Sequence, residues 1–430
     1  MTGGRTRSGQ AVDWSAFWTV AVGRYSTPLY LYELPTVHDR VGALRRALPE
    51  SVRVSYAVKA NGCLALVAQL RRLGCGADVC SRGELETVRA AGFSAADVVY
   101  TGPAKTDREI DEAVSWGVGL IVAESAAEAA RVACAAGRAG VRQPLLLRVN
   151  PGPRLARSGM ALTAPACKFG VDETEMLAVA RATRALPDLE LRGIHVSTES
   201  NVCSADRLLE RAEYACALVA PLAADGFDVE VVDLGGGLGV PHRVGDTPLN
   251  VRAYGAGLRR LTARHPQLSL ILELGRYPVA ESGTYLVSVV AVKRSRGATF
   301  VLVDGGINHL YRPRLTPPDR PPPVLSPSRA PAERVTVGGP LLDAADLLAE
   351  DVLLPRPQAG DLLAIPACGA YGFSHGLHGF CLHPTPAEVV WDGRRLHLVR
   401  ERGDPRGVTA GQQLLPETLH EAPEAVAVRR

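Results

Sequence analysis

Short apolar runs alternate with helix-like segments through the middle of the chain. Eight runs have the length and composition of strands, and most segments between them have apolar residues at helical spacing. The runs lie at 52–59, 77–80, 97–101, 119–123, 145–150, 190–196, 229–234 and 268–274. Strands that alternate with helices predict parallel βαβ units, and eight units predict a (β/α)₈ barrel of the TIM type. A doubly wound open sheet is the alternative, but its GxGxxG turn would often follow the first strand, where this chain has Lys59-Ala-Asn-Gly.

The pattern changes after residue 283. Strand-like runs continue there with no helical segments between them, which predicts a β-barrel or β-sandwich domain over 284–403. We expect the segment 14–34 to add a strand to this domain, so that the barrel occupies 35–283. Residues 1–13 are expected to be disordered, 316–332 to form a proline-rich surface loop and 404–430 to be a flexible tail. The later runs lie at 284–292, 299–303, 334–337, 361–365, 387–391 and 395–399.

Composition places the chain among two-domain globular enzymes. It has 430 residues, of which 47% are hydrophobic and 22% charged, and its net charge of +3 predicts no affinity for nucleic acid or membranes. The N-terminus lacks the apolar core of a signal peptide. Nine cysteines without a CxxC pair predict reduced thiols, a cytoplasmic location and no metal site.

The ends of the predicted barrel strands carry polar residues. Active sites of such barrels lie at the carboxyl ends of the strands, and Lys59 ends the first one. A lysine here is either a solvated strand-end residue or one kept to form a Schiff base with a carbonyl cofactor. The other polar residues at strand ends are Asp78, Ser81, Glu84, Arg148, Asn150, His195 through Ser200, Asp233, Glu273 and Arg276.

Two further features suit a phosphorylated cofactor. Gly235, Gly236 and Gly237 follow a strand directly, and such a turn exposes backbone N–H groups to a phosphate. The alternative is a tight turn that needs positive φ angles. Glu273 and Arg276 follow the next strand and could form a structural ion pair. With a phosphate site beside them, Arg276 could bind the phosphate and Glu273 could face a cationic ring nitrogen.

A lysine, a phosphate cradle and a carboxylate are what pyridoxal phosphate requires. The motifs that contain them resemble those of the fold-type III pyridoxal-phosphate-dependent decarboxylases, the family of diaminopimelate, ornithine and arginine decarboxylases. The resemblance runs from Thr27 to Glu388 and implies an alanine racemase-like barrel. The motifs include Thr27-Pro-Leu-Tyr-Leu-Tyr, Tyr56-Ala-Val-Lys-Ala-Asn, Arg148-Val-Asn-Pro, Asp233-Leu-Gly-Gly-Gly-Leu-Gly, Glu273-Leu-Gly-Arg and Gly369-Ala-Tyr-Gly.

The resemblance implies a role for each matching residue. Lys59 would form the Schiff base, and Glu273 would bind the pyridine nitrogen. Arg312 would bind the substrate carboxylate. The family also implies a homodimer with shared active sites, in which Tyr371 and the region near Asp343 come from the partner subunit. The phosphate would be held by Gly235, Gly236, Gly237, Gly275 and Arg276 with Ser200 and Tyr371, and the surrounding shell would include Asp78 and Glu84.

The chain departs from this family where the substrate would bind. Ser197 replaces a histidine that stacks on the cofactor, Glu199 replaces a glycine, and His195 is expected to be structural. Leu342 replaces the cysteine that donates a proton, so either Asp343, Lys59 or a water serves instead, or protonation is less stereocontrolled. We therefore expect Ser197, Glu199 and Asp343 at the substrate. These departures resemble a branch of the family that acts in natural-product pathways on aminoacyl groups tethered to a carrier protein.

Three functions remain open at this point. The first is decarboxylation of a carrier-tethered or otherwise modified amino acid in a specialised pathway. The second is decarboxylation of free diaminopimelate, and the third is a catalytically silent protein that binds pyridoxal phosphate. A carboxylate such as Glu273 at the ring nitrogen favours decarboxylation over racemisation, because it keeps the ring protonated as an electron sink.

Overall fold

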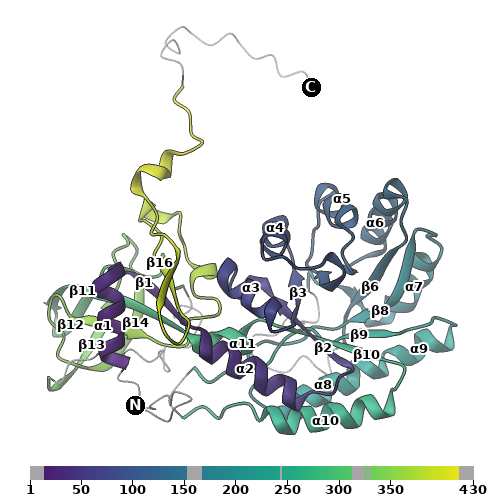
Figure 1. Cartoon of the computed structure of the whole chain (residues 1–430), viewed down its shortest axis with the longest axis horizontal. Helices are drawn as coiled ribbons and strands as arrows, with labels where there is room; N and C mark the ends of the chain where they lie inside the picture. Colours follow the sequence, from purple (N-terminus) through teal and green to yellow (C-terminus); the bar gives the residue numbers. More distant parts are fainter. Residues whose placement is uncertain (1–13, 153–166, 243–244, 312–324, 327–329, 416–430) are drawn as a thin grey trace.

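A parallel β-barrel with surrounding helices lies beside a mixed β-sheet (Figure 1). The computed structural model describes residues 14–152, 167–242, 245–311, 325–326 and 330–415. No helix within these ranges is long and apolar enough to cross a membrane.

All eight predicted barrel strands are present, and they close into a ring. Each pairs in parallel with its neighbours in the order β5-β4-β3-β2-β10-β9-β8-β6, and the pairing of β5 with β6 completes the barrel. A short strand, β7 (Val171–Asp172), extends β6 outside the ring. The barrel strands are β2 (Val52–Ala57), β3 (Gly76–Val79), β4 (Val98–Tyr100), β5 (Leu120–Ala123), β6 (Gln143–Asn150), β8 (Leu189–His195), β9 (Val231–Asp233) and β10 (Ser269–Leu274).

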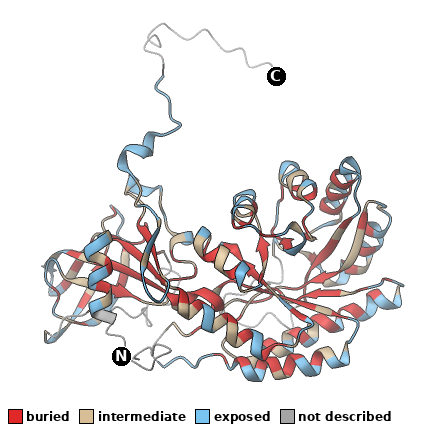
Figure 2. Cartoon of the chain, viewed as in Figure 1, coloured by how far each residue is buried: buried red, intermediate tan, exposed pale blue. Residues whose placement is uncertain are grey.

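Amphipathic helices cover the barrel and bury their apolar stripes against its strands, as Figure 2 shows by the red inner faces. One of them, α5 (Asp107–Trp116), begins at a capping box formed by Thr106 and Glu109 and ends at Gly117 in the left-handed conformation. The others are α2 (Leu34–Ala47), α3 (Leu64–Arg72), α4 (Arg82–Ala90), α6 (Ala126–Ala139), α7 (Met176–Arg184), α8 (Ala205–Ala217), α9 (Val219–Ala224), α10 (Val251–Arg264) and α11 (Arg276–Val279).

The second domain is a mixed sheet in the order β14-β13-β12-β11-β1-β16-β17, with β15 paired to β11. It contains β14 (Leu347–Pro355), which the sequence pattern did not reveal. Glu350 and Asp351 interrupt the apolar alternation of that strand and are exposed on it. The remaining strands are β11 (Gly283–Ser295), β12 (Ala298–Val303), β13 (Ala332–Gly338), β15 (Leu362–Ile365), β16 (Ala387–Trp391) and β17 (Leu396–Arg400).

The segment 14–34 contains a helix as well as the expected strand. The strand β1 (Leu29–Glu33) lies between β11 and β16, antiparallel to the first and parallel to the second. Before it, α1 (Trp14–Tyr25), a helix that was not predicted, packs Trp18 and Ala21 against Leu29 and Leu31. The apolar residues of α1 have no period-two alternation that would have favoured a strand.

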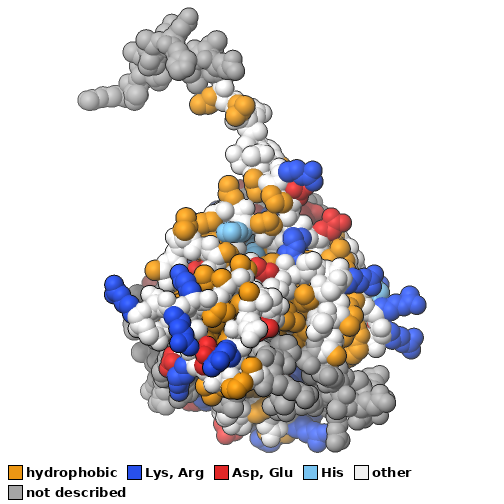
Figure 3. All heavy atoms as spheres, turned by 90° about the vertical axis from the view of Figure 1, so that its left-hand side faces the viewer, with side chains coloured by type: hydrophobic (Ala, Val, Ile, Leu, Met, Phe, Trp, Pro, Cys, Tyr) orange, Lys and Arg blue, Asp and Glu red, His pale blue; other side chains and the backbone are white. Residues whose placement is uncertain are grey.

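Several expected irregular segments lie wholly or largely outside the described residues. These are 1–13, most of 316–332 and 416–430. Between β17 and residue 415 the chain forms a 3₁₀ helix, Pro405–Thr409, and then extends away from the β domain (Figure 3). Leu414 and Leu415 are exposed on this segment.

Candidate active site

A pocket of about 290 Å³ lies at the carboxyl ends of the barrel strands. It brings together residues that are more than 300 positions apart in the sequence, from Lys59 to Tyr371. The predicted site residues that line it are Lys59, Ser197, Glu199, Ser200, Gly236, Gly237, Glu273, Gly275, Arg276 and Tyr371.

Lys59 lies in a 3₁₀ turn, Val58–Ala60, that follows β2, rather than in the strand itself. Its side chain is 44% exposed, and its Nζ donates a 2.9 Å hydrogen bond to Oδ2 of Asp78. Burial disfavours the charged form, but Asp78 and then Glu273 outweigh it, so the pKa of Lys59 is raised above its ordinary value. The protein thus holds this amine as an ammonium until something displaces Asp78.

Asp78 and Glu84 lie behind the lysine and do not line the pocket. The second oxygen of Asp78 accepts a 2.5 Å hydrogen bond from the Thr101 hydroxyl. Glu84 lies in the first turn of α4 and accepts a hydrogen bond from the backbone N–H of Cys80. Burial raises the pKa of both carboxyl groups. They therefore contact Lys59 and the backbone after β3 from behind the pocket.

Glu273 ends β10 and is buried at the opposite side of the pocket. Its Oε2 lies 3.2 Å from Nε2 of His195, and its Oε1 has no hydrogen-bond partner among the described residues. Burial alone would raise the pKa of Glu273, but His195 and then Lys59 lower it to about 2. Glu273 is therefore a carboxylate at neutral pH, with one oxygen left for a cationic or N–H donor.

The glycine turn packs so closely that side chains could not replace its hydrogens. A Cβ atom on Gly235, whose φ is +61°, would lie 2.7 Å from Cβ of Ser197. A Cβ on Gly236 would lie 2.5 Å from the backbone oxygen of Glu273. Asp233 holds the turn in place by accepting a 2.8 Å hydrogen bond from the Gly235 N–H. The turn is thus a preformed concavity of backbone, the kind of surface that binds a phosphate.

Arg276 begins α11 next to this turn. Its guanidinium lies over the ring of Tyr371, 4.8 Å from the centroid, and its Nη1 is 3.1 Å from Nε2 of His242. The Tyr371 N–H is hydrogen-bonded to the Ala60 carbonyl of the same chain. Tyr371 therefore completes the pocket of its own subunit, and the expectation that it comes from a partner was wrong.

The residues after β8 that depart from the family motif differ in what they contact. Ser197 and Ser200 face the pocket beside the glycine turn. Glu199 is buried, and its carboxylate accepts hydrogen bonds from Arg207 and Arg211 of α8. Because two arginines hold this carboxylate, its geometry does not support the substrate contact that we expected of Glu199.

Another expected substrate residue, Asp343, does not line the pocket of its own chain. Asp343 lies on the exposed turn between β13 and β14, where it accepts a hydrogen bond from the Ala345 N–H. Leu342, beside it, is 93% exposed. The single chain therefore does not bring Asp343 to Lys59. Arg312 lies outside the described residues.

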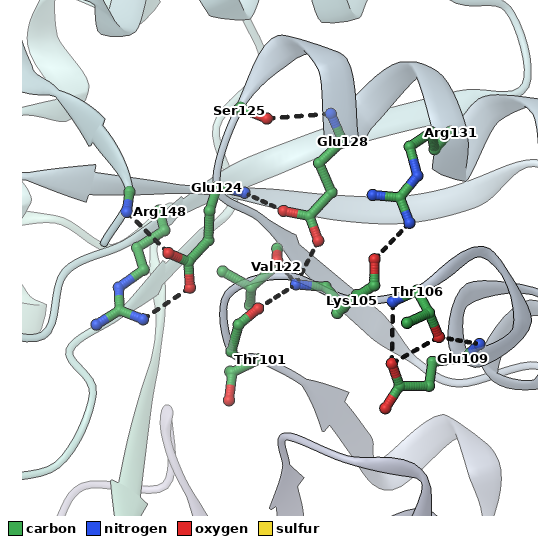
Figure 4. A network of polar contacts seen from close by, with 12 residues as sticks. Thr101, Lys105, Thr106, Glu109, Val122, Glu124, Ser125, Glu128, Arg131 and Arg148 are labelled. Atoms are coloured by element: carbon green, nitrogen blue, oxygen red, sulfur yellow. Dashed lines mark hydrogen bonds and ion pairs between the residues drawn. The ribbon is translucent and has the colours of Figure 1, made fainter. Parts of the chain in front are cut away.

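A buried polar network supports one wall of the pocket (Figure 4). Nζ of Lys105 donates to the carbonyls of Gly102 and Val122 and pairs with Glu128 at 2.7 Å. The Glu128 carboxylate also accepts from the Glu124 N–H, and Glu124 pairs with Arg148 at 2.8 Å. The network thus links α6 to the pocket residues Gly102 and Arg148.

Sequence reasoning missed several pocket residues. Cys80, Thr101, Gly102 and Phe169 line the pocket without having been proposed for the site. Burial raises the pKa of the Cys80 thiol to about 12, so it stays protonated at neutral pH. Its place directly after β3 was the one available signal, because side chains at the carboxyl ends of barrel strands face the site.

The described residues fit pyridoxal phosphate. The lysine amine, the glycine concavity with Arg276, and the unpaired Oε1 of Glu273 lie around one pocket. These groups suit, in turn, the cofactor's aldehyde, phosphate and protonated ring nitrogen.

Comparison with known proteins also points to a pyridoxal-phosphate enzyme. Residues 34–280 match the family model for the pyridoxal-dependent decarboxylase, pyridoxal binding domain. The chain is 32% identical over 410 residues to an L-glutamyl-[BtrI acyl-carrier protein] decarboxylase of Niallia circulans, covering 92% of this chain and 95% of that protein. It is 35% identical over 396 residues to a diaminopimelate decarboxylase of Pseudomonas aeruginosa, covering 92% and 94%. The crystal structure of diaminopimelate decarboxylase from Helicobacter pylori, complexed with L-lysine, superposes with a TM-score of 0.85 at 26% identity, covering 91% of this chain and 98% of that one.

Proposed function

The chain belongs to the pyridoxal-dependent decarboxylases, and on that premise we propose that it removes the α-carboxyl group of an amino-acid derivative in a specialised biosynthetic pathway. The placement of Lys59 and Glu273 around one pocket carries this proposal. Pyridoxal phosphate, when bound, supplies an aldehyde and an electron-accepting ring.

The chain's own groups have separate tasks in this proposal. Lys59 binds the cofactor and must first lose the proton that Asp78 stabilises. Glu273 faces the ring nitrogen as an anion and keeps it protonated. Arg276 and the turn at Gly235 would hold the phosphate at the other end of the cofactor and so restrict its orientation.

We propose that the substrate is an aminoacyl group tethered to a carrier protein. The relative from Niallia circulans acts on such a group, according to its name. Among the charged residues of the described lining, Arg148 is held by Glu124 and Glu199 by two arginines, and the cofactor would take up Lys59, Glu273 and Arg276. No charged group of the described lining is thus left over for a second charged end of a substrate. A tethered substrate has no such end, because its distal carboxyl group is esterified.

Free diaminopimelate is the second candidate, because diaminopimelate decarboxylases match this chain equally well. The two candidates separate in one assay of CO₂ release. We would compare diaminopimelate, free glutamate and a glutamyl thioester of pantetheine joined through the side-chain carboxyl group, since the α-carboxyl group must stay free to leave. Our proposal expects kcat/KM to be at least tenfold higher for the thioester than for free glutamate. Faster turnover of diaminopimelate would support the second candidate, and no CO₂ from any substrate would favour a silent binding protein.

We also propose a homodimer with shared active sites. Its support is the turn that carries Leu342, which is rigid and yet presents an apolar side chain to solvent. Asp346 accepts hydrogen bonds from the N–H groups of Ile307 and Leu341 and so fixes the base of the turn. A rigid turn that exposes a leucine suits an interface, where the side chain would be covered by the partner. Asp343 could then reach the partner's pocket.

A cytoplasmic location is part of the proposal. All nine cysteines are free thiols in the structure, five of them partly or fully exposed. Reduced thiols persist in a reducing compartment.

A further inference from the structure

Three buried acid–base groups lie together at the pocket, and two of them, His195 and Glu273, line it. His195, Asp233 and Glu273 end the adjacent strands β8, β9 and β10, and one ligating atom from each lies within 4.8 Å of the others. All three side chains are at least 95% buried. Two carboxyl groups this close together in a dry site disfavour each other's charged form, which favours a proton on one of them.

Asp233 is the group that holds it. Its carboxyl group is completely buried, and burial together with the charge of Glu273 raises its pKa well above the ordinary value. Glu273 is the anion of the pair, because His195 and Lys59 favour its charged form. A neutral Asp233 has one O–H to donate.

The hydrogen bonds show where that O–H goes. Oδ1 of Asp233 already accepts from the Gly235 N–H, whereas Oδ2 is buried without a partner among the described residues. Oε1 of Glu273 is likewise buried and unpartnered, and its two lone pairs allow it to accept from Asp233 as well as from a ring N–H. One oxygen of each carboxyl group lies within 4.8 Å of the other, so a proton on Oδ2 would place a donor beside the Glu273 carboxylate. A buried donor or acceptor that makes no hydrogen bond destabilises the folded protein.

We infer that Asp233 is a positioning residue that acts as a neutral acid and joins the two ends of the cofactor site. One of its oxygens fixes the glycine turn that would hold the phosphate, and the other donates to the carboxylate that would face the ring nitrogen. The distance between phosphate cradle and ring-nitrogen carboxylate is thus set through one side chain. This inference rests on the cofactor site of the proposed function.

The inference predicts that an amide can replace this acid. Asparagine has the shape of aspartic acid, accepts from Gly235 with its carbonyl and donates to Glu273 with its NH₂ group. Leucine has a similar volume and can do neither. The matched control is Glu128→Gln, which alters a buried carboxylate outside the pocket lining.

The test uses protein reconstituted with pyridoxal phosphate labelled with ¹⁵N at the ring nitrogen. We would measure the dissociation constant of the cofactor and the ¹⁵N chemical shift, which reports ring protonation. Asp233→Asn should match the wild type within about threefold in affinity and keep the same shift. Asp233→Leu should bind about tenfold to a hundredfold more weakly and move the shift, as loss of a supporting hydrogen bond does at other ligand sites. Glu128→Gln should lower the melting temperature without moving the shift.

Two results would overturn the inference. In the first, Asp233→Asn is as damaging as Asp233→Leu, which would mean that Asp233 acts as an anion or as a metal ligand; elemental analysis of the wild type separates these. In the second, Asp233→Leu leaves both measurements unchanged. If Asp233→Leu does not fold, Asp233→Ser takes its place, because a serine hydroxyl is too short to bridge Gly235 and Glu273. Failure of the wild type to bind the cofactor would instead refute the proposed function.

Discussion

Nζ of Lys59 lies 2.9 Å from Oδ2 of Asp78, and this carboxylate holds the lysine amine in its protonated form. The two residues come from the ends of β2 and β3, which are paired in register, so the contact follows from the barrel itself. An amine that attacks an aldehyde must be neutral. The ion pair with Asp78 that keeps Lys59 in place therefore also slows the attack of its amine on an aldehyde.

The pH dependence of cofactor attachment tests this relationship. Asp78→Asn removes the larger of the two carboxylate contributions that favour the ammonium, so the pKa of Lys59 falls relative to the wild type although Glu273 remains. The rate of pyridoxal phosphate attachment to the apoprotein should then reach its maximum at a pH about one unit or more below that of the wild type. Stopped-flow absorbance across a pH series measures this rate. Glu84→Gln is the control, because Glu84 contacts the backbone of Cys80 and not Lys59; an equal shift in that variant would contradict the account.

The buried pair of Lys105 and Glu128 gives a prediction about stability. Lys105→Met leaves the Glu128 carboxylate buried without its cation, which should lower the free energy of unfolding by about 3–5 kcal/mol. Adding Glu128→Leu should restore most of that loss, because the uncompensated charge is gone. Urea denaturation of the apoproteins measures both values. Equal stability of Lys105→Met and the wild type would show that the pair contributes little.

The pH dependence of stability provides a separate test of the protonated Asp233. The folded-state pKa of Asp233 is raised, so the native protein binds a proton that the unfolded chain releases above its ordinary pKa of about 3.9. Stability from this group is therefore fully present at low pH and decreases as the pH rises toward the folded-state pKa. The decrease is at most about 1.4 kcal/mol per pH unit. His195, Glu273, Asp78 and Lys59 face the same region.

Asp233→Asn cannot take part in this equilibrium. The difference in unfolding free energy between the variant and the wild type should move in favour of the variant between pH 5 and pH 8. Chemical denaturation of the apoproteins at several pH values measures the trend. A constant difference over that range would mean that Asp233 does not change its protonation on unfolding.

Leu342 provides the prediction about subunit association. In an isolated chain, a substitution at a side chain that is 93% exposed should change stability by no more than about 0.5 kcal/mol. In the proposed dimer, Leu342→Asp buries a charge and should weaken association at least tenfold. Sedimentation over a range of concentrations measures this. Leu414→Asp is the matched control, since Leu414 is equally exposed but lies on the segment beyond the β domain; the same weakening in both variants would not support an interface at Leu342.

The barrel could be predicted from the sequence because its signal is repeated eight times. Each βα unit has a short apolar strand and an amphipathic helix, so one ambiguous segment does not change the prediction of a barrel. In the β domain each strand has to be recognised alone. The acidic pair in Leu347–Pro355 was enough to hide one, and α1, which precedes the predicted strand near Leu29, was not predicted.

The site could be predicted only where the residue type decides the chemistry. Lys59, Glu273 and the glycine turn were recognisable because a Schiff base, a ring nitrogen and a phosphate each require one kind of group. The roles of Glu199, Lys105 and Asp233 depend on partners that fold in from other strands and helices. Their local sequence does not reveal whether a charged side chain is solvated or buried in a pair.

Covalent capture of the cofactor is the most direct test of the central claim. Borohydride reduction of protein reconstituted with pyridoxal phosphate fixes the cofactor to the amine that holds it, and peptide mass spectrometry identifies that residue. We predict a single phosphopyridoxyl group on Lys59 and none in Lys59→Ala, with Lys105 and Lys168 unmodified in both proteins. A label on another lysine, or no label in the wild type, would contradict the account.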